Sequence, residues 1–186
     1  MKLICLGDSL TYGFGVRHSK CWPSLVAQST GWDVSNCGLN GDTTGGMLSR
    51  FNSMSFKIDP STVVFLMGGA NDIFYCGNTD VARASMGALI QQAMATGALV
   101  VVGIPMNIGR GFYPEDWSRA VDFAGARQLM EEYRGWLKRF CEAFKVKYVD
   151  FAENWDESHM IDGLHPDEEG HAIMAKEVIR CLNSII

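Results

Sequence analysis

Two continuous apolar runs constrain the fold of this chain more than any other feature. Residues 62–67 read TVVFLM and residues 98–104 read ALVVVGI, without the alternation of polar and apolar side chains that marks a half-exposed strand. A strand that is apolar on both faces must be covered on both faces, which is typical of a parallel sheet packed between helices. The chain is therefore predicted to fold around a buried parallel sheet.

Strand-like segments at 2–6, 32–37, 61–67, 98–104 and 146–150 alternate along the chain with helical patterns. Strands that alternate with helices indicate a doubly wound α/β fold. No internal repeat, low-complexity tract or linker interrupts this pattern, so residues 1–186 are predicted to form a single domain. The hydrophobic periodicity places the helices at about 20–30, 43–54, 78–96, 118–143 and 167–184.

Charge and composition argue against several classes of partner. The net charge is −5 and the sixteen basic residues are dispersed, so we expect no nucleic-acid partner. No stretch approaches the roughly 20 apolar residues of a membrane span, and the first residues lack the pattern of a signal peptide. These features predict a cytoplasmic protein with no integral membrane segment. The six cysteines form no C-x-x-C pair and are expected to be reduced thiols of the core.

Polar residues and glycines follow three of the predicted strands. Ser9, in GDSL, follows the first strand; Gly41, in NCGLNGDTT, follows the second; Asn71, in GGANDIF, follows the third. Ligands of doubly wound sheets bind beyond the carboxyl ends of the strands. In the flavodoxin-like strand order 2-1-3-4-5 these three loops are neighbours, so a hydroxyl, a glycine backbone and an amide are expected to converge on one crevice.

The segment DGLHP, after the fifth strand, supplies the groups that a serine nucleophile needs. A serine hydroxyl is a weak nucleophile and requires an adjacent base, for which His165 is the candidate. Asp162, three residues earlier, can reach the other ring nitrogen, fix the tautomer and stabilise the imidazolium. The backbone N–H groups of Ser9 and Gly41 and the side-chain amide of Asn71 are candidate donors to a developing oxyanion. Together these residues predict acyl transfer.

Each of these residues also has a simpler interpretation. Ser9 suits a helix cap, Asn71 suits a turn, and His165 suits the flank of a helix N-terminus. His159, Asp162 and His165 form H-x-x-D-x-x-H, a spacing that a metal site could use. A non-catalytic flavodoxin-like binding module is a further alternative, although the first turn lacks the G-x-G-x-x-G pattern of dinucleotide sites.

The four blocks resemble those of the SGNH, or GDSL, hydrolases. Residues 7–11 (GDSLT) are similar to the nucleophile block and residues 36–43 (NCGLNGDT) to the glycine block, while residues 69–72 (GAND) fit G-x-N-D and residues 162–165 (DGLH) fit D-x-x-H. The match keeps the order of the family from residue 7 to residue 166. The resemblance implies a flavodoxin-like three-layer α/β/α sandwich with a five-stranded parallel sheet, and serine esterase chemistry that uses no metal and no cofactor.

Within this family the chain looks most like the small bacterial thioesterase, lysophospholipase and arylesterase branch. The resemblance implies a serine esterase or thioesterase that hydrolyses lipid-like, aryl or thioester acyl esters, with a small acyl ester as its partner. A carbohydrate O-acetylesterase of the same family is the alternative. No oligomeric state is predicted.

The irregular segment 105–117, PMNIGRGFYPEDW, is the predicted substrate-binding wall. It follows the fourth strand, so its start is expected at the same edge of the sheet as the nucleophile. Its large apolar side chains are too apolar for a freely solvated loop and are expected to line an acyl groove; a lid over local core or a subunit contact is the alternative. The residues concerned are Met106, Ile108, Phe112 and Tyr113.

Overall fold

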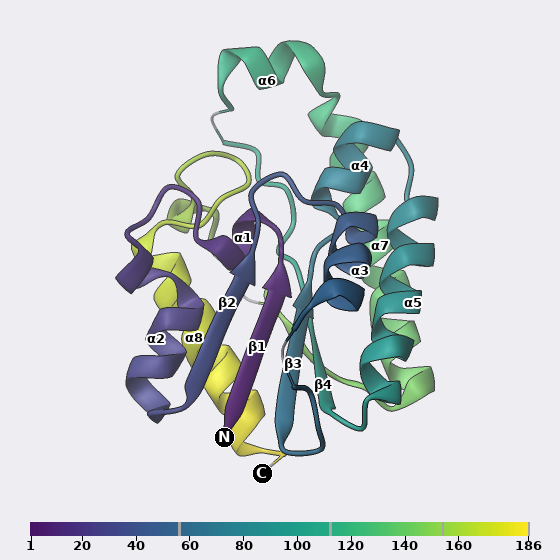
Figure 1. Cartoon of the computed structure of the whole chain (residues 1–186). Helices are drawn as coiled ribbons and strands as arrows, with labels where there is room; N and C mark the ends of the chain where they lie inside the picture. The colour runs from purple at the N-terminus through teal and green to yellow at the C-terminus, as the bar shows by residue number, and fades with distance from the viewer. Residues whose placement is uncertain (56, 112, 154, 186) are drawn as a thin grey trace.

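The fold is a parallel sheet between two layers of helices. The computed structural model describes residues 1–55, 57–111, 113–153 and 155–185 (Figure 1). Its five strands are all parallel and lie in the order β2-β1-β3-β4-β5. The predicted five-stranded sheet and flavodoxin-like order are therefore confirmed. The strands are β1 (Lys2–Gly7), β2 (Asp33–Gly38), β3 (Thr62–Met67), β4 (Leu99–Ile104) and β5 (Lys147–Asp150).

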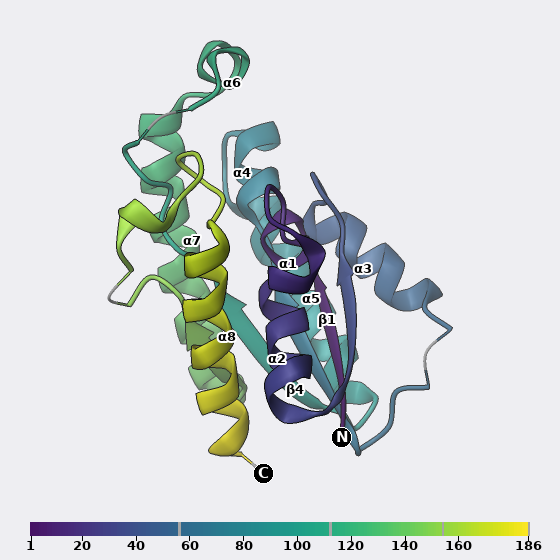
Figure 2. The same cartoon turned by 90° about the vertical axis from the view of Figure 1, so that its left-hand side faces the viewer.

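Helices cover both faces of the sheet. In Figure 1, α2 and α8 lie on one side and α3, α5 and α7 on the other, while Figure 2 shows α6 standing beyond the other helices at the carboxyl end of the strands. None of the described helices is both long enough and apolar enough to cross a membrane. The helices are α1 (Ser9–Tyr12), α2 (Trp22–Thr30), α3 (Thr44–Ser53), α4 (Ala70–Cys76), α5 (Asp80–Ala95), α6 (Glu115–Ala120), α7 (Phe123–Phe144) and α8 (Glu168–Asn183).

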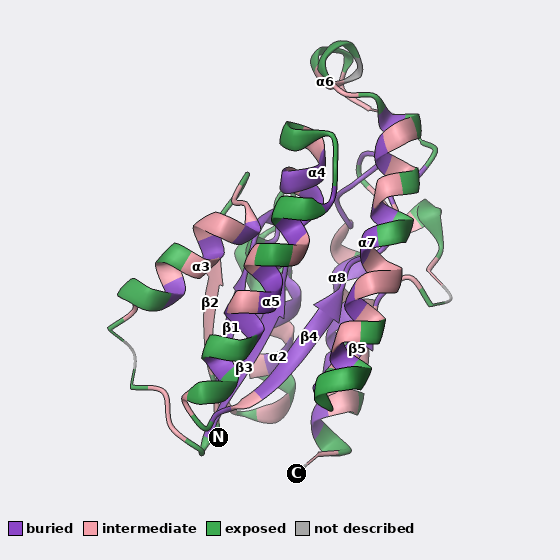
Figure 3. Ribbon diagram, turned by 90° about the vertical axis from the view of Figure 1, so that its right-hand side faces the viewer, coloured by how far each residue is buried: buried purple, intermediate pink, exposed green. Residues whose placement is uncertain are grey.

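Alternate residues of β3 pack into two separate cores. Phe65 lies in the core under α2 and α8, whereas Val64 and Leu66 lie in the core under α3, α5 and α7. All three side chains are fully buried, and Figure 3 shows β3 and β4 as buried strands between the helical layers. Burial of a side chain of this size stabilises the fold by about 1.5–3 kcal/mol. The apolar run of β3 therefore stabilises both layers at once.

The helix predicted over 118–143 is two helices. Asp122 lies between α6 and α7, and its carboxylate accepts the backbone N–H groups of Ala124 and Gly125, both at 3.1 Å. A carboxylate in this position satisfies the free N–H groups of a new helix, so α7 begins there and α6 is left as a separate element. Two short helices that the periodicity did not predict, α1 and α4, directly follow β1 and β3.

The cysteines are all free thiols. Cys5, Cys21 and Cys141 are buried, as expected for thiols of the core, and burial raises the pKa of the Cys141 thiol to about 12. Cys76, at the end of α4, is exposed, so the expectation of a core position was wrong for this residue. The helix ends there because Gly77 takes the left-handed conformation.

Candidate active site

Ser9 lies at the carboxyl end of the sheet, where β1 turns directly into α1. The turn is tight because Gly7 has no side chain: a Cβ there would lie 2.6 Å from the carbonyl oxygen of Met67. The cap of α1 is Asp8, whose Oδ1 accepts the N–H of Leu10 at 2.9 Å. Ser9 is therefore not the capping residue, and its hydroxyl is available for another partner.

That partner is His165. The Ser9 hydroxyl lies 2.9 Å from His165 Nε2, and the opposite ring nitrogen, Nδ1, lies 2.9 Å from Asp162 Oδ2. Because the carboxylate faces Nδ1, the proton of the neutral ring resides there and Nε2 accepts the serine proton. The structure thus aligns a hydroxyl, an imidazole and a carboxylate in the order that nucleophilic catalysis requires.

The loop before α8 holds the acid and the base together. Asp162 Oδ1 accepts the backbone N–H groups of Leu164 at 2.8 Å and His165 at 2.7 Å, and the N–H of Ile161 donates to the carbonyl of His165 at 2.8 Å. Burial of Asp162 opposes its ionisation, but its hydrogen bonds to the His165 ring and to the two N–H groups hold the pKa of the carboxyl below its usual value. Asp162 is therefore a charged acceptor at neutral pH.

Gly41 and Asn71 lie at the same cavity as Ser9, as the strand order predicts. Gly41 has φ 74°, a left-handed conformation that favours glycine and bends the β2–α3 loop at this point. The Asn71 amide donates to the backbone carbonyl of Asp42 at 2.8 Å, which uses one of its two N–H groups. Ser9, Gly41 and Asn71 all line one cavity.

This cavity has a volume of about 320 Å³ and a mostly apolar wall. Two rings pack against the imidazole: the ring centroids of Phe14 and Trp117 lie 4.5 Å and 5.7 Å from that of His165, and the planes of Trp117 and His165 meet at 62°. Such rings reduce the access of water to the reacting groups. Besides Ser9, Gly41, Asn71 and His165, the lining residues are Phe14, Asn40, Phe74, Tyr75, Trp117, Ala120, Val121, Phe123 and Leu164.

Of the expected substrate-binding residues, the three that the structure describes, Met106, Ile108 and Tyr113, do not line this cavity. Met106 and Ile108 are each 1% exposed, and they pack in the core under α2 and α8 and in the core under α3, α5 and α7, respectively. The N–H of Gly109 donates to the carbonyl of Gly163 at 2.8 Å, which joins this segment to the loop before α8. Tyr113 stacks on Phe123 at 3.6 Å and so lies behind a residue of the wall. Phe112 lies outside the described residues.

The wall is instead formed mainly by α4 and by the segment from Trp117 to Phe123. Trp117, Ala120 and Val121 line the cavity at i, i+3 and i+4, a spacing that puts them on one side of α6 and its end. Trp117 ends the irregular segment that was expected to form the wall, but none of these three residues was predicted as a substrate contact. The helical spacing of apolar residues in WSRAV was the available signal.

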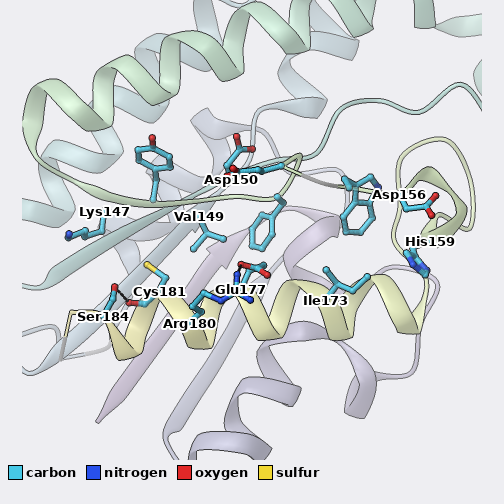
Figure 4. Close-up of a pocket in the computed structure, with 14 residues that line it drawn as sticks. Lys147, Val149, Asp150, Asp156, His159, Ile173, Glu177, Arg180, Cys181 and Ser184 are labelled. Atoms are coloured by element: carbon cyan, nitrogen blue, oxygen red, sulfur yellow. Dashed lines mark hydrogen bonds and ion pairs between the residues drawn. The ribbon is translucent and has the colours of Figure 1, made fainter.

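A second, larger hollow of about 750 Å³ lies between β5 and α8 (Figure 4). Asp156 and His159 line one end, and His159 Nδ1 lies 3.9 Å from Glu169 Oε2 rather than beside His165. Among the described residues, no three His, Cys, Asp or Glu side chains are grouped so as to hold a metal ion. The residues that align for chemistry are those of the smaller cavity.

Comparison with known proteins gives consistent matches. The model of the GDSL-like lipase/acylhydrolase family matches residues 5–173. An arylesterase of Vibrio mimicus is 29% identical over 185 residues, which cover 95% of this chain and 86% of that protein. Thioesterase 1/protease 1/lysophospholipase L1 of Escherichia coli (strain K12) is 25% identical over 191 residues, covering 99% and 84%.

A solved structure has the same fold. The crystal structure of a member of the lipolytic protein G-D-S-L family from Veillonella parvula superposes with a TM-score of 0.83, at 24% identity, and covers 97% of both chains. The likeness therefore extends over the sheet and both helical layers.

Proposed function

The chain belongs to the GDSL-like lipase/acylhydrolase family and is a carboxylic ester hydrolase; from this premise we propose that it cleaves apolar acyl or aryl esters and thioesters through Ser9, His165 and Asp162. One observation carries the assignment of these three residues: the 2.9 Å contact between Ser9 Oγ and His165 Nε2 in a cavity that Gly41 and Asn71 also line.

Ser9 is the nucleophile. Its Oγ attacks the carbonyl carbon of the ester while its proton passes to His165 Nε2. Asp162 stabilises the imidazolium through Nδ1 without itself taking the proton. The tetrahedral oxyanion accepts hydrogen bonds from the backbone N–H groups of Ser9 and Gly41 and from the free N–H of the Asn71 amide.

The intermediate then collapses to an acyl-enzyme. The bond to the leaving alcohol or thiol breaks, and His165 gives its proton to that leaving group. His165 next takes a proton from a water molecule, whose oxygen attacks the acyl carbon. Collapse of the second intermediate returns the proton to Ser9 and releases the carboxylic acid.

The apolar cavity supports an acyl or aryl substrate. Phe14, Phe74, Tyr75, Trp117 and Val121 line it, so a substrate gains by burying hydrocarbon, at about 0.8 kcal/mol per methylene. A sugar requires several polar side chains placed around its hydroxyls. Outside the proposed catalytic and oxyanion residues, only three described lining residues, Asn40, Tyr75 and Trp117, carry polar side-chain atoms, which favours an apolar ester over an acetylated carbohydrate.

The test is hydrolysis of a panel of esters by the wild-type chain. We expect turnover of aryl and short- to medium-chain acyl esters, with thioesters of the same acyl groups as a second series. Ser9→Ala should lower kcat by roughly 10⁴ to 10⁶, as for removal of other triad nucleophiles. Ser184→Ala, in the hollow of Figure 4, is the matched control and should keep wild-type rates.

Two results would overturn the proposal. Retention of most activity in Ser9→Ala would remove the nucleophile from the mechanism. Release of acetate from acetylated sugars, with no turnover of aryl or acyl esters, would replace the proposed substrate class by the carbohydrate alternative.

A further inference from the structure

Arg50, on α3, makes four hydrogen bonds that join separate segments at the carboxyl end of the sheet. Its Nε and Nη2 donate to Asp42 Oδ2 at 2.8 and 2.6 Å. Its Nη1 donates to the carbonyl of Cys37 at 2.8 Å, and Nη2 also donates to the carbonyl of Gly7 at 3.0 Å. One guanidinium thus contacts the end of β1, the end of β2 and the loop between β2 and α3.

These acceptors are close in sequence to the proposed oxyanion donors. Gly7 precedes Ser9 by two residues, and Asp42 directly follows Gly41. Asp42 is also the residue whose backbone carbonyl accepts the Asn71 amide. Arg50 therefore holds the segments that position all three proposed donors. These donors are the N–H of Ser9, the N–H of Gly41 and the side-chain amide of Asn71.

The ion pair between Arg50 and Asp42 is largely shielded from water. The Asp42 side chain is 8% exposed and that of Arg50 is 28% exposed. Arg50 satisfies its N–H groups on a carboxylate and two carbonyls because its guanidinium is planar and rigid, whereas a lysine ammonium is a single point of charge on a flexible stem. Loss of the cation would leave the Asp42 carboxylate buried without its partner and free the loop to move.

The α3 end of the same loop is fixed by a different contact. Asp72 accepts the backbone N–H of Thr44 at 2.9 Å and its hydroxyl at 2.8 Å. Thr43 caps α3 by accepting the N–H of Gly46 at 3.1 Å. Asp42 is free to pair with Arg50 because Thr43 takes the capping role.

We propose that Arg50 is a positioning residue for the oxyanion hole. Through its hydrogen bonds to Gly7, Cys37 and Asp42, it sets the distance between the N–H groups of Ser9 and Gly41. The inference rests on the proposed function. Arg50 lies outside the lining of the cavity, so it acts through the donors rather than on the substrate. Donors that are placed for the tetrahedral intermediate stabilise the transition state more than the bound ester.

Arg50→Gln should therefore lower kcat by about 10- to 100-fold, the cost of displacing reacting groups by about 1 Å, while KM changes by about twofold or less. The kcat of Arg50→Lys should lie between those of wild type and Arg50→Gln, because lysine keeps the positive charge but lacks the planar guanidinium. Asp42→Asn keeps the carbonyl for Asn71 but loses the ion pair, so it should reproduce most of the loss. The fold-loss of kcat in the double variant Arg50→Gln/Asp42→Asn should be much smaller than the product of the two single-variant losses.

An aryl trifluoromethyl ketone separates positioning from folding. Serine adds to this ketone and forms a hemiketal whose oxyanion occupies the hole, so its inhibition constant should weaken by the same factor as kcat/KM. The matched control is Arg134→Gln. Arg134 is also a mostly buried arginine, paired with Asp150 Oδ1 at 2.9 Å and Asn107 Oδ1 at 2.8 Å, but on the β5 side of the sheet. Arg134→Gln should lower the midpoint of thermal unfolding without changing kcat or the affinity for the ketone.

The outcomes distinguish this inference from the proposed function. If wild type hydrolyses esters and Ser9→Ala does not, but Arg50→Gln keeps wild-type kcat and ketone affinity, the positioning role is overturned and the esterase assignment stands. A loss of kcat with unchanged ketone affinity also overturns it, because the oxyanion site would then be intact. If Arg50→Gln does not fold, the same comparisons apply to Arg50→Lys and Asp42→Asn. Absence of ester turnover by wild type overturns the proposed function itself.

Discussion

Asp162 binds the imidazole of His165 at Nδ1 and the backbone N–H of the same residue, at 2.9 and 2.7 Å. One carboxylate therefore fixes both the ring and the main chain that carries it. This double contact limits the rotation of the imidazole about its own side-chain bonds. The proposed base is held with Nε2 toward Ser9 before any substrate arrives.

Asp162→Asn should abolish most activity without unfolding the chain. An amide can still bond the backbone N–H groups, but its NH₂ group favours the wrong imidazole tautomer, so kcat should fall on the order of 10⁴ with little change in KM. Asp156→Asn is the control, because Asp156 accepts the N–H of Ser158 in the same loop, away from the cavity. Steady-state kinetics on a chromogenic ester would measure both, and a loss under tenfold in Asp162→Asn would contradict the assigned role.

Asn71→Ala should lower kcat by roughly 10² to 10³, as expected for one oxyanion donor. The variant also removes the bond to the Asp42 carbonyl, so the loop of Gly41 loses one of its anchors. Asn78→Ala is a suitable control, because Asn78 bonds the carbonyl of Cys76 on the exposed side of the α4–α5 turn. Equal kcat values for wild type and Asn71→Ala would exclude the amide as a donor.

The sheet was predictable because its signal is local. An apolar run such as TVVFLM must be buried on both faces wherever it lies, and β3 occupies Thr62–Met67, within the expected range 61–67. The order of loops at the carboxyl ends follows from the strand order, so the neighbourhood of Ser9, Gly41 and Asn71 was predictable as well. Their proposed catalytic roles came from the types of residue and from the family resemblance.

The contacts of Arg50 and Trp117 were not predictable in this way. Arg50 meets Gly7 across 43 positions of the sequence, and nothing in the local pattern distinguishes it from a solvated helix residue. Trp117 was assigned to an irregular loop, whereas it lies on α6, a helix of only six residues. The i, i+3, i+4 spacing of Trp117, Ala120 and Val121 occurs only once in a helix this short, which makes it a weak signal. Met106 and Ile108 illustrate the opposite error. They were expected to line the substrate site, but apolar residues that follow a strand can pack back into the core, and these two do.

Stability should depend on the charge of Asp8. Burial raises the pKa of this carboxyl to about 7; the charge of His165 lowers it, and the charges of Asp42 and Asp72 raise it further. The unfolded-state pKa is near 3.8, so the folded chain binds the extra proton, and stability falls as pH rises from about 4 to about 7. Asp8→Asn removes this titration.

The free energy of unfolding of Asp8→Asn relative to wild type should therefore increase between pH 5 and pH 8, by about 2–3 kcal/mol. Urea unfolding at the two pH values measures the difference. Asp33→Asn, an exposed residue at the start of β2, is the control and should show no such increase. A pH-independent difference for Asp8→Asn would show that Asp8 is ionised at both pH values.

His171 should have the opposite pH dependence. Its ring is fully buried on α8, Nδ1 accepts the backbone N–H of Trp22 at 3.3 Å, and burial lowers its pKa from 6.5 to about 4. The unfolded chain then binds the extra proton, so the stability that neutral His171 contributes is present above pH 6.5 and is lost as pH falls toward 4. His171→Gln keeps an acceptor for Trp22 and should flatten the loss of stability between pH 6.5 and pH 4.5. The exposed His18 offers the control substitution, His18→Gln, which should leave that slope unchanged.

Selectivity for the acyl or aryl group should depend on Trp117. This side chain lines the cavity and lies edge-on to His165, so its removal takes away apolar surface beside the reacting centre. Each substrate methylene that loses contact with the wall costs up to about 0.8 kcal/mol. Trp117→Ala should therefore reduce kcat/KM more for longer acyl and aryl esters than for acetate esters.

Arg119→Ala is the control on the same helix, since Arg119 pairs with Glu115 on the exposed side. The measurement is kcat/KM for acyl chains of increasing length with the three proteins. A uniform loss across the series would assign Trp117 to holding His165 in place, and no loss at all would remove α6 from the substrate site.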